Sequence, residues 1–231
     1  MTIDHLYVIW SAPSDGGRHV VGHLARQRVG STFHFWYEDD LSAAFAKGFT
    51  FLPAFPEHRR VDAPYEARYL FATFADRIPS AQRADAARML ASWGVGHPDD
   101  QFEVLTKSGG LRATDRIELA EYRTADDPLV EPLEFRVAGM KHVPPGSRGA
   151  LVVGAMLRFE REPSNPHDPF ATIVARTADG MRAGYVPRQY SAMIANLLDL
   201  GVALAAVAVR ELVLPDDAPR WVVRASRASE S

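Results

Sequence analysis

A proline-bounded loop carries the side chains of this chain that are best suited to bind a polar ligand. Residues 161–169 read R-E-P-S-N-P-H-D-P, and the prolines restrict the backbone, so the polar groups are presented in a fixed order. Asn165 can donate and accept hydrogen bonds, while the Asp168 carboxylate accepts them, for example from a hydroxyl group. Arg161 can donate to a phosphate. We therefore expect a stiff loop that binds a ligand with hydroxyl or phosphate groups.

Cationic and aromatic residues flank this loop in the sequence. Lys141 and His142 precede it, and the run A-G-Y-V-P-R at 183–188 follows it with Tyr185 and Arg188. The end of a single nucleic-acid strand needs partners for its free hydroxyl, cations for the adjacent phosphate and a flat surface for the unstacked base. These residue types supply each of those partners.

The ordered set of motifs from Glu134 to the C-terminus resembles the HIRAN domain family. The resemblance rests on F-R-V-A-G at 135–139, Lys141-His142, the 161–169 loop, the apolar run 170–174 and G-Y-V-P-R at 184–188. It implies an OB-like β-barrel that binds DNA. In the best-known members, which are fork-remodelling translocases, the ligand is the 3′-hydroxyl end of single-stranded DNA.

The resemblance implies a role for each of these side chains. Asp168 would accept a hydrogen bond from the terminal hydroxyl, and Asn165 would bond nearby. Lys141 and Arg188 would meet phosphates, and His142 would stack on a base. A carboxylate at this place repels an internal phosphate but accepts a hydroxyl, so it would distinguish strand ends from continuous strands.

The chain departs from the family pattern at the stacking surface. Members with characterised end binding usually carry an aromatic pair after the basic residue, whereas His142 is followed here by Val143. Each stacked base contributes about 1–3 kcal/mol, so the missing ring would weaken binding. Tyr185 could compensate for it, or it could belong to the core. Arg188 stands where a lysine is common, which keeps the charge and adds a planar fork.

Structural alternatives stay open for the same residues. Asn165 and Asp168 could bond their own backbone in turns rather than contact a ligand. Lys141 and Arg188 could be solvated surface charges, and His142 could be an ordinary, partly exposed side chain. Arg161 has acidic neighbours on both sides, so we expect it to form an intramolecular ion pair.

The sequence offers little support for catalysis or a cofactor. His142, His167 and Asp168 could form a metal site, but two of them are adjacent in sequence and no further ligand is evident. The chain also lacks the clustered carboxylates with a lysine that are typical of nucleases. We expect no metal, no other cofactor and no enzyme activity.

Composition and charge narrow the class of protein. The 231 residues, 47% of them hydrophobic, can form two modest domains with cores. The absence of cysteine excludes disulfides and thiolate zinc sites. The N-terminus lacks a signal-peptide pattern, and the longest apolar run, 202–209, is too short to span a bilayer. We expect a cytoplasmic protein without membrane contact.

The charge distribution bears on how nucleic acid could be bound. The net charge is −3, with −4 in residues 1–130 and +1 in residues 131–231. Long-range attraction to duplex DNA should therefore be weak. Any nucleic-acid binding must depend on a few placed groups.

Periodicity predicts an α+β module over residues 1–123. Leu6, Val8 and Trp10 share one face of a strand, a second strand covers 33–37, and D-G-G at 15–17 forms a turn. We expect a helix that opens at Ser80 as its N-cap and stops at Gly94. A short helix over 100–105 and a strand over 116–122 complete the module.

This module resembles the N-terminal subdomain of HipA-type toxin kinases. The resemblance rests on V-V-G-H-L at 20–24, F-H-F-W-Y at 33–37, F-A-D-R-I-P at 74–79 and F-E-V-L at 102–105 followed by Gly109-Gly110. The catalytic-loop Asp/Asn set and the metal-binding D-F-G-like motif of a kinase are missing. The resemblance implies an alternative function, in which residues 1–123 bind and restrain a separate HipA-like toxin kinase.

A stretch rich in turn formers and charge, 124–132, is predicted to link this module to a barrel at 133–231. One amphipathic helix is expected within the barrel, because Tyr190, Met193 and Ile194 recur at helical spacing before Gly201. Many short strands with one such helix favour an OB-like barrel. The expected strands are 133–138, 154–159, 170–175, 183–186, 203–209 and 221–224.

Overall fold

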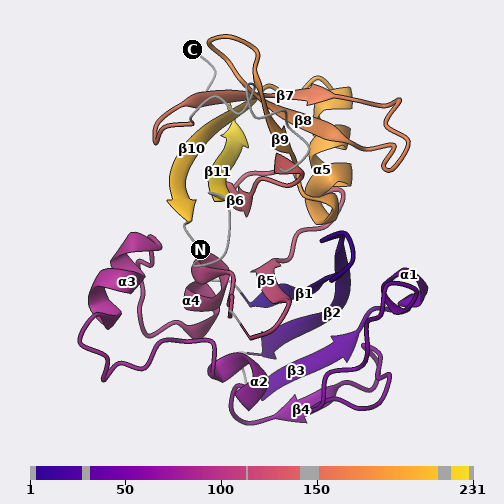
Figure 1. The fold of residues 1–231 in the computed structure, drawn as a ribbon, viewed down its shortest axis with the longest axis vertical. Helices are drawn as coiled ribbons and strands as arrows, with labels where there is room; N and C mark the ends of the chain where they lie inside the picture. Colours follow the sequence, from indigo (N-terminus) through magenta and orange to yellow (C-terminus); the bar gives the residue numbers. More distant parts are fainter. Residues whose placement is uncertain (1–3, 28–31, 113, 141–150, 213–219, 229–231) are drawn as a thin grey trace. The chain divides into compact units, whose positions relative to one another are not determined.

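The computed structural model describes residues 4–27, 32–112, 114–140, 151–212 and 220–228. The chain forms two compact units, Met1–Tyr122 and Arg123–Ser231 (Figure 1). No helix within the described ranges is long and apolar enough to cross a membrane.

The N-terminal unit is built on a five-stranded antiparallel sheet in the order β4-β3-β2-β1-β5 (Figure 1). Alternation in the first strand predicts its buried face correctly: Leu6 and Val8 are fully buried and Trp10 is 9% exposed. These side chains belong to one large core cluster. The strands are β1 (His5–Ser11), β2 (Arg18–Gln27), β3 (Thr32–Tyr37), β4 (Tyr65–Ala67) and β5 (Ile117–Glu121).

Short helices contribute apolar side chains to the same core. Phe74 comes from α2, while Phe102 and Leu105 come from α4, which packs on β1 and β5. Asp100 caps α4 by accepting from the amides of Phe102 and Glu103. The helices are α1 (Ser42–Phe45), α2 (Ala72–Ala75), α3 (Ala86–Ser92) and α4 (Gln101–Ser108).

The predicted helix start at Ser80 is wrong, because α3 begins only at Ala86. The Ser80 hydroxyl accepts from the Gln82 amide at 3.3 Å, and the amides of Arg83 and Ala86 each bond three residues back. Such local bonds offer the backbone an alternative to the helical ladder. The segment 80–85 therefore forms successive tight turns.

The C-terminal unit is a curled six-stranded sheet in the order β6-β11-β10-β7-β8-β9 (Figure 1). An isolated antiparallel bridge between Ala138 and Tyr185 joins the segment after β6 to the opposite edge strand β9. The sheet thus curls until its two edges meet, as expected for an OB-like barrel. The strands are β6 (Leu133–Arg136), β7 (Met156–Arg161), β8 (Thr172–Arg176), β9 (Arg182–Tyr185), β10 (Leu204–Leu212) and β11 (Arg220–Arg227).

A glycine makes this edge contact sterically feasible. Gly184 adopts φ +150°, and a Cβ built on it would lie 2.5 Å from the Ala138 carbonyl oxygen and 2.5 Å from Val137 Cγ1. The backbones of β9 and the segment after β6 can approach this closely only without a side chain at position 184.

The predicted amphipathic helix is confirmed as α5 (Arg188–Asp199). It buries Tyr190, Met193 and Ile194 and packs on β8. Gly201, with φ +76°, ends it, and the Gly201 amide donates to the Leu198 carbonyl. The helix begins at Arg188, the last residue of the G-Y-V-P-R motif.

Residues 124–132, the predicted linker, lie within the C-terminal unit. Leu129 is fully buried and adopts φ +51°, and the Asp127 carboxylate accepts from its amide at 2.7 Å. Arg227 donates to the Pro128 carbonyl at 2.7 Å. The stretch is fixed by short polar bonds within this unit.

Candidate nucleic-acid interface

The loop between β7 and β8 contains Asn165 and Asp168, two of the predicted ligand residues. Both side chains form turns with their own backbone: Asn165 Oδ1 accepts from the His167 amide at 3.0 Å, and Asp168 Oδ1 accepts from the Phe170 amide at 2.8 Å. The turn-forming alternative is therefore confirmed for both residues. These bonds hold the loop in one conformation.

The same bonds leave part of the Asp168 side chain available. Asp168 is half-buried, and its Oδ2 has no hydrogen-bond partner among the residues that the structure describes. The Asn165 amide donates to Glu162. A turn-forming role is thus compatible with one remaining acceptor at Asp168.

Glu162 organises a hydrogen-bond network beneath the loop that the sequence analysis did not identify. Its Oε2 accepts from Asn165 Nδ2 at 2.6 Å and from the Tyr185 hydroxyl at 2.8 Å, and its Oε1 accepts from Arg182 at 3.1 Å. The bonds from Asn165 and Tyr185, with the nearby Arg182 cation, lower the pKa of the Glu162 carboxyl. The network ties the loop to β9 through an ionised carboxylate.

Tyr185 is held by this network and by its neighbours. Its hydroxyl also accepts from Arg182 at 2.7 Å, and the Arg182 guanidinium carbon lies 5.1 Å from the ring centroid. Gly139 approaches the ring so closely that a Cβ there would lie 3.1 Å from Tyr185 Cδ2. Partial burial and the bond to Glu162 raise the pKa of the phenol. Tyr185 is therefore a half-buried, fixed ring.

Arg161 anchors the base of the loop rather than projecting toward a ligand. It pairs with Asp199 of α5 at 3.0 Å and donates to the carbonyls of Pro169 and Ala171. An intramolecular ion pair was predicted and is present, but its partner is Asp199, 38 residues away in sequence, and not one of the adjacent glutamates. This contact fixes the loop relative to the helix.

Of the predicted cationic residues, the structure describes Arg188 but not Lys141 or His142. Arg188 is exposed at the first residue of α5, and its guanidinium makes no ion pair with any residue in the described ranges. Lys141 and His142 lie outside the described residues. Arg188 is thus accessible to a phosphate, and both alternatives for it stay open.

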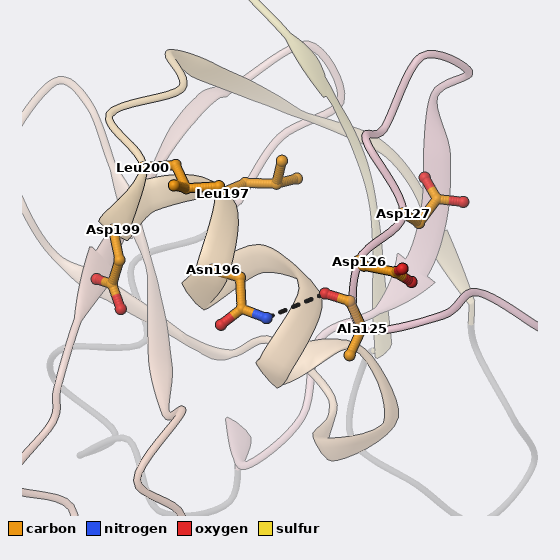
Figure 2. A pocket seen from close by; sticks show the side chains of 7 residues that line it. All are labelled: Ala125, Asp126, Asp127, Asn196, Leu197, Asp199 and Leu200. Carbon is orange, nitrogen blue, oxygen red and sulfur yellow. Dashed lines mark hydrogen bonds between the residues drawn. The ribbon is translucent and has the colours of Figure 1, made fainter.

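A pocket of about 400 Å³ lies at the C-terminal end of α5 (Figure 2). The Asn196 amide crosses it to donate to the Ala125 carbonyl at 3.1 Å. Its lining includes three carboxylates, of which Asp127 pairs with Arg123 and Asp199 pairs with Arg161. None of the four described candidate residues lines the pocket. The lining residues are Ala125, Asp126, Asp127, Asn196, Leu197, Asp199 and Leu200.

The N-terminal unit holds a second cluster of titratable side chains. His5 Nε2 lies 3.0 Å from His23 Nδ1, and His23 Nε2 lies 2.9 Å from Glu38 Oε1. Desolvation and the neighbouring His23 lower the pKa of His5 to about 4. Within the described ranges, no group of three or more His, Asp or Glu side chains is arranged to hold a metal ion.

Comparison with known families bears directly on the C-terminal unit. The model of the family described as "HIRAN domain" matches residues 130–215. This match supports a HIRAN domain at residues 130–215. This assignment agrees with the curled sheet and supports a DNA-binding role for the unit.

Two solved structures resemble part of the chain. The crystal structure of the HIRAN domain of human HLTF is 19% identical, with a TM-score of 0.33, over 43% of this chain and 78% of that one. A protein from Lactobacillus plantarum is 22% identical, with a TM-score of 0.31, over 42% of this chain and all of that one. No curated protein matches the chain.

Proposed function

We propose that this protein binds single-stranded DNA through its HIRAN domain, prefers 3′-hydroxyl ends and performs no catalysis. The observation that carries the proposal is the fixed loop at 161–169 within the matched region, in which Asp168 keeps one carboxylate oxygen unbonded to the described residues. The exposed Arg188 supplies a cation in the same domain.

The electrostatics of the loop favour a strand end over a strand interior. A carboxylate oxygen accepts a hydrogen bond from a 3′ hydroxyl, whereas a phosphate at the same position brings two negative charges together. Because turn bonds already fix Asp168, little conformational entropy is lost when a ligand binds. The preference therefore arises from repulsion of the wrong ligand as well as from attraction of the right one.

Fluorescence anisotropy with matched oligonucleotides tests this function. One probe ends in a 3′ hydroxyl, a second in a 3′ phosphate, and a third is a closed circle of the same length. We expect tightest binding to the hydroxyl end. Equal affinity for all three probes would contradict end recognition but leave single-strand binding intact, and no binding to any probe would refute the DNA-binding function.

For the N-terminal unit we propose a protein-contact role, with a HipA-like kinase as the alternative partner suggested by its sequence resemblance. Within this unit, Tyr69 is 83% exposed, while its neighbours Leu70 and Phe74 are buried in the core. Co-purification of the tagged chain with a kinase encoded beside it would support this role. If the tagged chain purifies alone and does not bind the purified kinase, this role is contradicted.

A further inference from the structure

Arg182 lies beside the loop but belongs to none of the motifs that suggested a ligand. It is the first residue of β9, and its side chain is 41% exposed. Glu162 accepts from both Arg182 and Asn165, so one carboxylate connects this arginine to the loop. Arg182 therefore extends the candidate interface from the loop onto β9.

We propose that Arg182 binds a backbone phosphate next to the strand end and that Glu162 and Tyr185 hold it in place for this contact. The inference deepens the proposed function and rests on it. It assigns the phosphate contact to a residue on the barrel strand, in addition to the cation at the start of α5.

The guanidinium retains donors for such a ligand. An arginine side chain has five N–H donors. Two of its bonds are to Tyr185 and Glu162, and it makes no other bond to the residues that the structure describes. The exposed side chain can therefore donate to a phosphate without losing its internal partners.

The surroundings of Arg182 favour a phosphate over a stacked base. The guanidinium carbon lies 5.1 Å from the centroid of the Tyr185 ring, so this ring already occupies one position where a base could stack on Arg182. The charge of Glu162 is shared among donors from Asn165, Tyr185 and Arg182, so it opposes a phosphate less than a free carboxylate would. A fixed guanidinium also loses little entropy on binding.

The salt dependence of DNA binding tests this contact. We would measure affinity for a 5′-labelled oligothymidylate with a 3′ hydroxyl over a salt series, for the unaltered chain, Arg182→Ala and Arg182→Lys. Arg224→Ala is the matched control, because Arg224 is also half-exposed on a strand of this unit and paired with a glutamate, Glu134. Thermal melting of each variant checks the fold.

We expect Arg182→Ala to weaken binding about tenfold and to flatten the slope of log affinity against log salt by about 0.7, the value for one phosphate contact on a single strand. Arg182→Lys should keep the slope. If Arg182→Ala behaves like Arg224→Ala while the unaltered chain binds, the phosphate contact is overturned and the proposed function survives. If the unaltered chain does not bind, the proposed function fails.

Tyr185→Phe separates positioning from charge. It keeps the ring beneath Arg182 but removes the hydroxyl that bonds both Arg182 and Glu162. We expect a severalfold loss of affinity with an unchanged salt slope, because the cation remains. Unchanged affinity would overturn the positioning role of Tyr185.

Discussion

Replacement of Gly184 by alanine should selectively destabilise the C-terminal unit. The added Cβ would lie 2.5 Å from both the Ala138 carbonyl oxygen and Val137 Cγ1, and φ is +150°. The unfavourable backbone conformation costs about 1–3 kcal/mol, and the overlap adds about 1–3 kcal/mol. The carbonyl cannot move away easily, because Ala138 is held by two backbone bonds to Tyr185. We expect a total loss of about 4 kcal/mol.

Differential scanning calorimetry measures this loss. In a unit of this size, about 1 kcal/mol corresponds to several degrees in Tm, so the transition of the C-terminal unit should fall by more than about 10 °C. Gly154→Ala is the control, since Gly154 also has a positive φ, of 86°, but no atom lies within 4 Å of its built Cβ. It carries the backbone cost without the overlap, so it should lower Tm by clearly less than Gly184→Ala does. Equal shifts in the two variants would refute the steric argument.

Three further predictions concern single side chains. Arg188→Ala should weaken binding to every DNA end and flatten the salt slope by about 0.7, measured by anisotropy; an unchanged slope would leave Arg188 a solvated charge. The pKa of His5, about 4, lies below its usual 6.5. The contribution of His5 to the free energy of unfolding is therefore fully present above about pH 6.5 and is lost as the pH decreases toward 4. The melting temperature should show this fall, and His5→Phe, which keeps a ring against Tyr122, should reduce it. Arg77→Met should cost about 3–5 kcal/mol in chemical denaturation, because it leaves Asp115 and the Gly110 carbonyl without their buried partner; a loss below about 1 kcal/mol would contradict this.

Regular elements with long-range hydrophobic periodicity could be predicted from the sequence. Leu6, Val8 and Trp10 identified a strand face, and Tyr190, Met193 and Ile194 identified the buried face of α5. In both cases the side chains that recur at the period of the strand or helix are the buried ones. The helix start at Ser80 failed because a local side-chain bond, which the hydrophobic pattern does not report, competes with the helix.

The loop was recognisable from its sequence, but the network that supports it was not. Glu162 and Arg182 are 20 residues apart, and they meet only because β7, β8 and β9 pair in sequence order. An irregularity between Val174 and Ala175 also shifts the register of the β8–β9 pair, so counting along the strands does not give the correct neighbours. The only sequence feature that pointed to this network was Glu162, which directly follows Arg161.

Several functional assignments remain predictions. The HipA-like nature and partner of residues 1–123 rest on sequence resemblance, and so do the roles of Lys141 and His142. For Asn165 and Asp168 the structure adds a definite local function, because both stabilise turns. A ligand role for them must therefore be tested with substitutions that preserve those turns.

The ratio of the dissociation constants for 3′-phosphate and 3′-hydroxyl oligonucleotides, compared between the unaltered chain and Asp168→Asn, tests the central claim most directly. Asparagine keeps an oxygen for the Phe170 amide but removes the charge that repels phosphate. Asp179→Asn is the control, since Asp179 also accepts a backbone amide, that of Met181, in the turn between β8 and β9. We predict a ratio well above one that falls toward one only in Asp168→Asn. A ratio of one in the unaltered chain, or an unchanged ratio in Asp168→Asn, would contradict the account.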